Sequence, residues 1–466
     1  MKHLGLFFSF LAIPPLALLV SGCGGGAGSA SSSAQTAQII TFDNPGTQTV
    51  GAPLTLSATA NSGFVVSFAS TTPSVCTVSG TTATFGVAGT CTIDASVAGN
   101  GTYTAASQVA QSFTVNPAIG SATTVYIVGE AITSSPGATD ETTVPEEWQL
   151  KSGSPPATAT PLSVPGGMTA AVANAIVVSG SNVYAAGTVS NSASQSAVYW
   201  MNGMVTTLPP PSGMANTAAA AIAVSGGNVY VAGSAASSAG VEAAVLWVNG
   251  TPTTLSPPSG MTNCSATAIV VSGGDVYMVG TAWSNDIEKW AAYWVNGVAT
   301  LLPMPGGLTV DYYANGIAVS GGEVYVSGYT DSGMGNLTAV SWANSGWATT
   351  LPLPSGWQLE EYEANGITVS GSDVYVVGGG VNNAGTTAAA YWMNGAPTTL
   401  PMPGTMPNSS AASYASGIAI SGSDVYVVGY AGQTAAYWVN DGEGTLLPMP
   451  SGAYKSWANA VAVSNQ

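Results

Sequence analysis

The stretch ANGITVSGSDVYVVG from Ala364 to Gly378, followed by AAAYWMNGAPTTLPMP from Ala388 to Pro403, is one copy of a unit that recurs along the chain. Successive later copies lie 46 to 51 residues apart, a period that suits a four-stranded unit rather than a helical repeat. The seven copies are marked by a VYxxG core at Tyr126, Tyr184, Tyr230, Tyr277, Tyr325, Tyr375 and Tyr426 and by Trp148, Trp200, Trp247, Trp294, Trp342, Trp392 and Trp438.

The first and last copies are incomplete in complementary ways. The repeats begin at Thr123 with a VYxxG strand that lacks a preceding AxxIxVSG strand, and they end in ANAVAVSN at Asn465 with no VYxxG strand after it. Pairing the last strand beside the first removes two exposed sheet edges, which would otherwise favour aggregation. We therefore predict an all-β, seven-bladed β-propeller over residues 123–466, closed by pairing of its N- and C-terminal strands.

Side-chain size changes in a regular way along each unit. The innermost predicted strand carries Ala three residues before its aligned Ile or Val, at positions such as Ala173 and Ala364. The second strand carries Val and Tyr, and the third carries Trp. Because blades converge towards the axis of a propeller, this gradient predicts close packing between wedge-shaped sheets, with Trp and Tyr mainly in the core.

The order AxxIxVSG, VYVVG, AYWxNG and TxLPxP is similar to kelch-type propellers, and the AYW-NG segment resembles the HAF-type repeats of exported bacterial proteins. Gly378-Gly379 matches the kelch double glycine, and the resemblance covers residues 122–466. It implies the propeller fold. It implies no particular activity, because such folds carry many functions.

Residues 38–116 contain no copy of the repeat. Segments such as QIITF, VCTVSGTTATF and QSFTV alternate β-branched with small polar residues between turn residues, which predicts a β-sandwich. The segments SVCTVSG, GTCTIDA and QSFTV resemble bacterial Ig-like domains. Cys76 and Cys91 fall in adjacent predicted strands, so we expect a disulfide between them in an oxidising compartment. We predict that residues 117–122 are a linker.

Residues 1–22 resemble a bacterial lipoprotein signal peptide. One Lys, an apolar run from Leu4 to Leu19 and the sequence Val20-Ser21-Gly22-Cys23 carry this resemblance. It implies cleavage before Cys23 and lipidation of Cys23, so that the chain is exported, anchored to a membrane and located at the outer membrane or cell surface. The alternative is an ordinary secretory signal. Residues 23–37 have the composition of a flexible tether.

Cleavage would remove the only His, His3, and the sequence contains no Arg. The basic residues left would be Lys151, Lys289 and Lys455. This inventory excludes Ser-His-Asp and Cys-His catalysis, His-ligated metals and Arg clamps on phosphate. It also excludes nucleic acid as a partner. Carboxylate chemistry, oxygen-ligated calcium and binding of neutral ligands remain. We expect no cofactor. A calcium ring on the recurring Asp and Asn of the SGxD turns is the one alternative, and we do not favour it, because Asp and Asn in such turns usually hydrogen-bond their own backbone.

Large aromatic and acidic residues gather in the longer connections on one face of the predicted propeller. Aromatic rings beside carboxylates suit sugars, whose apolar ring faces stack while their hydroxyls donate to the acids. Ordinary packing at the rim, with charge for solubility, is an equal alternative. The candidate ligand face comprises Trp283, Asp286, Trp290, Asp311, Tyr313, Trp357, Glu360, Glu363, Tyr414 and Trp457.

Three functions are compatible with these features. We favour a non-enzymatic binding or adhesion protein whose loop face contacts a glycan or another neutral polymer. The second is a carboxylate-based glycoside-cleaving enzyme, with its acid and base drawn from Asp286, Glu288, Asp311, Glu360, Glu361 and Glu363. The third is a structural or assembly component that binds a surface protein. Cys264 aligns with Thr217 and Tyr312, so we expect a buried free thiol, with intermolecular pairing as the alternative.

Overall fold

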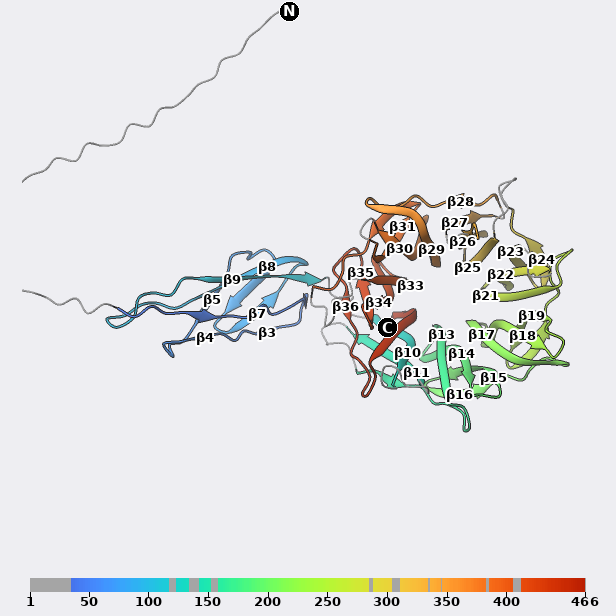
Figure 1. Ribbon diagram of the computed structural model, residues 1–466, viewed down its shortest axis with the longest axis horizontal. Helices are drawn as coiled ribbons and strands as arrows, with labels where there is room; N and C mark the ends of the chain where they lie inside the picture. The colour runs from blue at the N-terminus through green and yellow to red at the C-terminus, as the bar shows by residue number, and fades with distance from the viewer. Residues whose placement is uncertain are drawn as a thin grey trace, which may run out of the picture.

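The computed structural model describes residues 35–116, 123–133, 142–151, 158–284, 288–303, 311–333, 336–344, 346–382, 385–404 and 412–465. Every regular element in these residues is a β-strand, which confirms the all-β prediction. The described part of the chain contains no helix long and apolar enough to cross a membrane. Figure 1 shows a small N-terminal β unit and a ring of sheets around a central opening.

The N-terminal unit contains three small sheets. Their strand orders are β2-β9-β8-β5, β3-β7-β6 and β1-β4, with β2 parallel to β9. A core that includes Phe42, Ile93 and Phe113 fills the space between them. The strands are β1 (Ile40–Thr41), β2 (Gln48–Thr49), β3 (Leu54–Thr55), β4 (Thr59–Ala60), β5 (Ser67–Ser70), β6 (Cys76–Ser79), β7 (Thr82–Phe85), β8 (Gly89–Ser96) and β9 (Val109–Asn116).

The predicted disulfide of this unit is present. Cys76 in β6 and Cys91 in β8 are joined, with 5.7 Å between their Cα atoms, and both are buried in the core. The bond ties the β3-β7-β6 sheet to the β2-β9-β8-β5 sheet. Since a disulfide restricts the unfolded chain, it stabilises a unit whose core is small.

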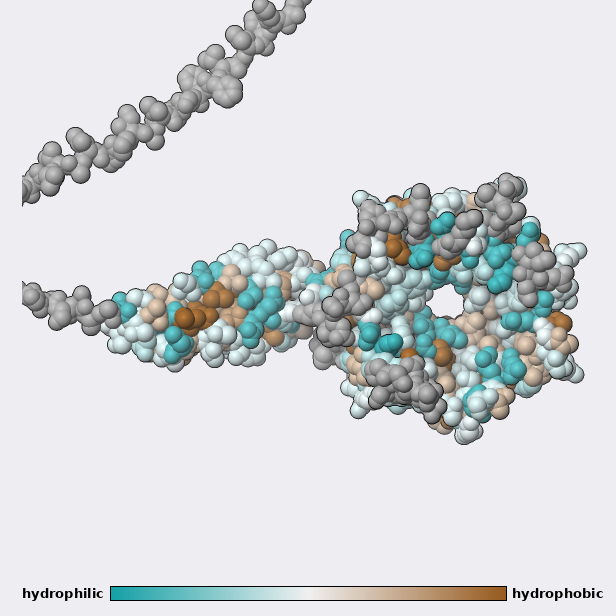
Figure 2. Space-filling model, in the orientation of Figure 1, coloured by the Kyte–Doolittle hydropathy of each residue, from teal (hydrophilic) through white to brown (hydrophobic). Residues whose placement is uncertain are grey.

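The remaining strands form seven four-stranded sheets arranged around the opening visible in Figure 2. This arrangement is a β-propeller. The first sheet has the order β37-β10-β11-β12, with β10 (Thr123–Ile132), β11 (Thr143–Lys151), β12 (Thr160–Pro161) and β37 (Lys455–Asn465). The second consists of β13 (Ala170–Ser179), β14 (Asn182–Ser190), β15 (Gln195–Met201) and β16 (Met204–Thr207). The third consists of β17 (Met214–Ser225), β18 (Asn228–Ser237), β19 (Glu242–Val248) and β20 (Thr251–Thr254).

The other four sheets each use four consecutive strands. They are β21 (Asn263–Ser272), β22 (Asp275–Ser284), β23 (Glu288–Val295) and β24 (Val298–Leu301); β25 (Asp311–Ser320), β26 (Glu323–Asp331), β27 (Leu337–Ala343) and β28 (Thr349–Thr350); β29 (Trp357–Ser370), β30 (Asp373–Asn382), β31 (Thr387–Met393) and β32 (Ala396–Thr399); and β33 (Ser413–Ser421), β34 (Asp424–Ala431), β35 (Thr434–Val439) and β36 (Thr445–Leu446).

The two ends of the repeat region pair as predicted. Strand β37 lies antiparallel to β10, with Thr123 opposite Asn465 and Ile132 opposite Lys455. The first sheet therefore takes its innermost strand, β37, from the C-terminal end of the chain, and its other three strands, β10 to β12, from the start of the repeats. This pairing gives β10 a partner on both sides and makes β37 the innermost strand of its sheet, as β13 and β17 are of theirs.

The Trp column lies between neighbouring sheets, which confirms its predicted place in the core. All seven indoles are at most 2 % exposed. Each also donates its Nε1–H to a backbone carbonyl of the segment that follows the outermost strand of the preceding sheet, for example Trp247 to Pro209 at 2.8 Å and Trp392 to Pro352 at 2.7 Å. The indole thus fills the wide outer part of the gap while its one polar atom is satisfied.

A bulge in each innermost strand explains the glycine of the VYxxG core. At these bulges a carbonyl of the inner strand turns towards the glycine of the second strand. A Cβ at Gly187 would stand 1.9 Å from the Val172 oxygen, and one at Gly328 would stand 1.9 Å from the Tyr313 oxygen. All seven sheets repeat this contact, so only glycine fits there.

Hydrogen bonds join the innermost strands of neighbouring sheets. Asn315 Nδ2 donates to the Ala364 carbonyl at 3.0 Å, and Asn365 Nδ2 donates to the Ala415 carbonyl at 3.1 Å. Asn459 Nδ2 of the C-terminal strand makes the same bond to Ala173 at 3.0 Å. The Asn459 bond joins the C-terminal strand β37, in the first sheet, to β13 in the second.

Cys264 is a buried free thiol, as predicted. Its Sγ accepts the Ala244 N–H of the preceding sheet at 3.4 Å, where Thr217 and Ser413 use hydroxyl oxygens in the equivalent way. Burial raises the pKa of the thiol to about 11. A thiol of this kind is inert at neutral pH, because the thiolate is the nucleophile.

Candidate functional site

The two faces of the propeller differ in their connections. One face carries tight hairpins, in which Asn202, Asn249, Asn296, Asn344, Asn394 and Asn440 adopt φ values of 49–56°. There the Asp275 and Asp373 carboxylates each accept the side-chain amide of the adjacent hairpin Asn at 2.8 Å. In the part of the chain that the structure describes, no group of three or more His, Cys, Asp or Glu side chains is placed to hold a metal ion.

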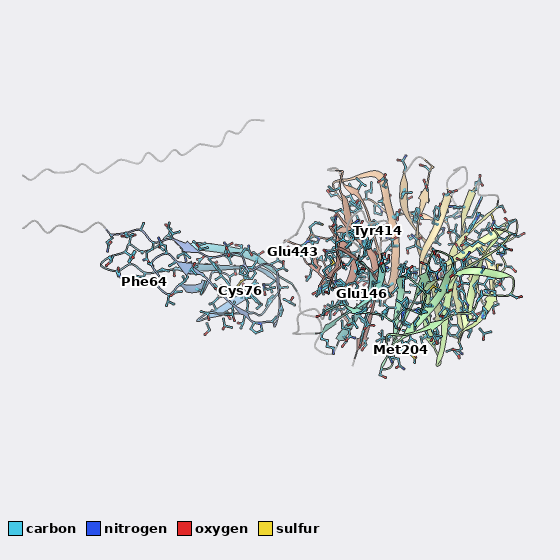
Figure 3. The ribbon with its side chains drawn as sticks, turned by 60° about the horizontal axis from the view of Figure 1, so that its bottom comes forward. Phe64, Cys76, Glu146, Met204, Tyr414 and Glu443 are labelled. Atoms are coloured by element: carbon cyan, nitrogen blue, oxygen red, sulfur yellow. A yellow bond between two sulfur atoms is a disulfide. The ribbon has the colours of Figure 1, made fainter. Side chains whose placement is uncertain are left out.

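The opposite face contains a cavity of about 470 Å³ between three neighbouring sheets. We call it the Tyr414 pocket, and Figure 3 labels Tyr414 on this side of the ring. It gathers three carboxylates, two tyrosine rings and backbone from strands β26 to β34. Its lining is Asp331, Leu337, Glu361, Glu363, Gly379, Gly380, Val381, Thr387, Tyr414 and Tyr430.

Tyr414 is fixed by contacts on both sides. Its hydroxyl donates to Glu363 Oε2 at 2.7 Å, although the two residues come from different sheets. Its ring stacks on Tyr430, the directly opposite residue of β34, with centroids 5.9 Å apart and planes 19° from parallel. Burial, followed by the charge of Glu363, raises the pKa of Tyr414 well above its usual range. Tyr414 therefore acts as a neutral hydrogen-bond donor that orients Glu363.

Glycine makes room for this tyrosine. A Cβ at Gly379 would lie 2.4 Å from the Tyr414 ring, and one at Gly380 would lie 2.7 Å from the ring of Trp357. Other sheets carry Thr188, Ser234 or Tyr329 where the β30 sheet has Gly379. Trp357 itself is 9 % exposed, so its indole lies beneath the pocket rather than on the ligand face.

Glu361 is held in an unusual backbone conformation at the edge of the pocket. Its φ is 62°, in the left-handed region that Glu rarely adopts, within an irregular stretch of β29 between Trp357 and Tyr362. Its side chain is exposed, whereas that of Tyr362 turns inward and donates to the Leu351 carbonyl at 3.0 Å. Strained backbone of this kind concentrates at binding sites, where it aims a side chain.

A second aromatic cluster adjoins the pocket on the β25–β28 sheet. Tyr313 stacks on Tyr329, with ring centroids 4.6 Å apart, and the ammonium of Lys289 lies 5.3 Å from the Tyr313 ring. Asp311 accepts the Lys289 backbone N–H at 2.9 Å. Burial raises the pKa of Tyr329, and the charge of Glu363 contributes next, which places this cluster within electrostatic range of the pocket.

The predicted ligand face therefore divides into separate groups. Glu363 and Tyr414 line one cavity, while Asp311 and Tyr313 belong to the neighbouring cluster. Trp283, Trp290 and Trp457 are half-buried on other strands, β22, β23 and β37. Asp286 lies outside the described residues, and Glu360 falls in β29 without a described side chain.

Sequence reasoning did not single out Gly379 and Gly380 as part of a site. The signal was present, because three consecutive glycines follow Val377 where other copies have one. The glycine run alone did not indicate a site, because Tyr414, whose ring lies against Gly379, is 35 residues further along the chain. Two other cavities, of about 300 and 350 Å³, include none of the candidate residues among their described lining.

A buried carboxyl lies elsewhere, between the first and last sheets. Glu146 of β11 is 3 % exposed, and its Oε2 has no hydrogen-bond partner among the described residues. It is two residues from Trp148, so both side chains leave the same face of the strand, towards the β33–β36 sheet. Burial raises the pKa of Glu146 to about 7. The equivalent positions in other sheets, opposite the repeat glycine, include Val198, Val245 and Val340.

No protein-family model matches the chain, and no curated protein matches it. Solved structures with similar folds include YjhT, at 13 % identity over 63 % of this chain and 97 % of that one, with a TM-score of 0.34. A quinoprotein alcohol dehydrogenase-like protein from Bacteroides thetaiotaomicron matches at 10 % identity over 93 % of this chain and 97 % of that one, with a TM-score of 0.35. The structure of YCF48 bound to D1 peptide matches at 9 % identity over 62 % of this chain and 81 % of that one, with a TM-score of 0.34. At these scores the similarities carry no argument about function.

Proposed function

We propose that the chain is an exported, lipid-anchored binding protein whose propeller binds a glycan in the Tyr414 pocket. In this proposal Cys23 carries the lipid, residues 38–116 are an Ig-like β-sandwich that acts as a spacer, and the seven sheets are the blades of one seven-bladed propeller related to kelch-type and HAF-type repeats. The Cys76–Cys91 disulfide supports an exported location, because such bonds persist in oxidising compartments.

The observation that carries the proposal is the meeting of Tyr414, Tyr430 and the carboxylates of Asp331, Glu361 and Glu363 around one cavity. A volume of about 470 Å³ is in the range of small-molecule sites. The tyrosine rings offer faces for the apolar side of a sugar ring. The carboxylate oxygens accept hydrogen bonds from its hydroxyls, and these bonds are stronger than neutral ones because the acceptor is charged.

A glycoside-cleaving enzyme is the second candidate, because two of the proposed acids, Glu361 and Glu363, line the same cavity. Such an enzyme needs one carboxylate and one protonated carboxylic acid on opposite sides of the scissile bond. The hydroxyl of Tyr414 donates to Glu363 Oε2 at 2.7 Å and so holds this carboxylate in one orientation, which suits the base or nucleophile. In this alternative Glu361 is the acid. A third alternative is that the loop face contacts a surface protein.

A glycan-array screen of the chain from Gln35 onward, with and without calcium, tests the proposal. We expect binding to one class of glycan, lost in a Tyr430→Ala, Glu361→Gln double variant. Glu323→Gln is the matched control, since Glu323 is an exposed acid on the hairpin face, paired to Tyr325 Oη at 2.5 Å. Absence of binding in both conditions would contradict the proposal. Release of new reducing ends from a bound glycan would favour the enzyme instead.

A further inference from the structure

One end of the N-terminal unit exposes apolar side chains. Val65 is 87 % exposed, Ile39 is 66 % exposed and Phe64 is 38 % exposed. Phe64 stands edge-on to Tyr103, with ring centroids 5.6 Å apart. We call these four residues the entry tip, because they lie where the described chain enters the unit.

Hydrogen bonds hold the entry tip together. The Ile39 N–H donates to Asn61 Oδ1 at 3.0 Å, and the Asn61 N–H donates back to the Ile39 carbonyl at 3.1 Å. Thr36 forms a β-bridge with Tyr103. The segments around Ile39, Phe64 and Tyr103 are thus joined in one surface rather than scattered.

The same surface carries no charge. Residues 35–42, 58–67 and 97–108, which contribute the entry tip, contain no Asp, Glu, Lys or Arg. Clustered apolar side chains in an uncharged surface are typical of contact with another apolar phase, because their exposure to water is unfavourable. An apolar phase without sequence-specific polar contacts is a better fit than a protein partner, since protein interfaces usually carry a polar rim.

The entry tip lies at the end of the unit away from the propeller. Strands β8 and β9 run along the unit, and eight residues of strand span about 27 Å. The chain leaves at Asn116, near Gly89, whereas Tyr103 lies beyond the opposite end of these strands. Figure 3 shows Phe64 at the far end of the unit, with Cys76 closer to the propeller.

The chain length before the unit keeps the entry tip close to any lipid on Cys23. Cys23 and Gln35 are separated by residues 24–34, which are mostly Gly, Ser and Ala. A Gly- and Ser-rich chain of this length has a root-mean-square end-to-end distance of about 20 Å. That distance spans one headgroup layer, which is about 5 to 8 Å thick, and leaves about 12 Å beyond it, so the entry tip stays within reach of the bilayer surface.

We propose that the entry tip inserts into the boundary between lipid headgroups and acyl chains of the membrane that carries the anchor. This inference rests on the proposed lipid anchor. Phe64 and Val65 enter the apolar layer, and Tyr103 takes the position at the headgroups that amphipathic rings prefer. Two attachments, the lipid and the tip, set the N-terminal unit upright on the membrane.

Site-specific fluorescence tests the inference in the full-length lipidated protein, reconstituted into phosphatidylethanolamine–phosphatidylglycerol vesicles. Val65→Cys is labelled with an environment-sensitive dye. Val87→Cys is the matched control, because Val87 is 57 % exposed and lies near Gly89 at the other end of the unit. Cys264 is buried and Cys76 is in the disulfide, so the introduced thiol takes the label.

We expect the dye at position 65 to shift its emission to shorter wavelength and to be quenched by lipids spin-labelled near the headgroup, while the dye at position 87 shows neither effect. Adding Phe64→Asp should return the emission at position 65 to its value in water. Protein that floats with the vesicles but shows an aqueous spectrum at position 65 would overturn this inference and leave the anchor intact. Protein that fails to float with the vesicles would overturn both.

Discussion

Trp148 Nε1 donates a 3.0 Å hydrogen bond to the carbonyl oxygen of Pro448, three hundred residues further along the chain. An equivalent bond joins each of the remaining six pairs of neighbouring sheets, for example from Trp247 to Pro209. The junction between the first and last sheets is therefore built like the internal junctions, and its contribution to stability should be similar.

We predict that Trp148→Ala destabilises the propeller by about 3 to 5 kcal/mol, the usual effect of removing a buried aromatic side chain. Trp247→Ala is the internal control and should have an effect of the same size. Urea unfolding followed by circular dichroism measures both. A far smaller effect for Trp148→Ala would mean that the ring is open between its first and last sheets in solution.

The repeat glycine should tolerate no side chain. In Gly187→Ala the new Cβ would meet the Val172 carbonyl at 1.9 Å, and backbone atoms on both sides would have to move. We expect a large loss of thermal stability or failure to accumulate as folded protein. Gly166→Ala, with no atom within 4 Å of the new Cβ, should change the melting temperature little. Equal stability of the two variants would contradict the bulge geometry.

Stability should fall as pH rises between about 4.5 and 7, because of Glu146. Its pKa is 4.5 when unperturbed and about 7 in the folded protein. In that interval the unfolded chain has lost the proton while the folded protein retains it, so rising pH favours unfolding. The full shift corresponds to about 3 kcal/mol, reached near pH 7 and constant above it.

Glu146→Val should remove this pH dependence and raise stability at pH 8, since Val occupies the equivalent position in three other sheets. Urea unfolding at pH 5 and pH 8 measures the difference, with Glu147→Gln, on the opposite face of β11, as the control. If the parent protein and Glu146→Val lost equal stability between the two pH values, Glu146 would not be the group responsible.

Cys264 should not react with thiol reagents in the folded protein. Burial and a pKa of about 11 both keep the thiolate population small at pH 8. Iodoacetamide should therefore modify the protein only after unfolding, as detected by mass spectrometry. Rapid modification of the folded chain would show that Cys264 is accessible, and would restore the alternative of intermolecular pairing.

The propeller was predictable from the sequence because its determinants recur. Each copy repeats a buried Trp, a VYxxG glycine and small residues on the inner strand, so one pattern is stated seven times. Pairing of β10 with β37 followed from the two half-copies alone. The sequence did not reveal why the glycine is needed, since the bulge that brings a carbonyl onto Gly187 depends on backbone geometry rather than residue type.

The candidate site was only partly predictable. Aromatic and acidic residues on the long connections indicated the face on which the Tyr414 pocket lies, and aligning the inner strands placed Glu363 and Tyr414 at one level. The direction of each side chain was not predictable. Tyr414 turns towards Glu363, whereas Trp357 turns beneath Gly380, because the local irregularity of β29 decides which side chains face the cavity.

The proposed function requires the Tyr414 pocket to be the binding site. Isothermal titration calorimetry with the glycan selected on the array tests this directly. The proposal predicts that the Tyr430→Ala, Glu361→Gln double variant loses roughly tenfold or more in affinity, as expected for residues at the centre of a site, while Glu323→Gln binds like the parent protein. Unchanged affinity in the double variant would contradict the account and move the binding site away from the pocket.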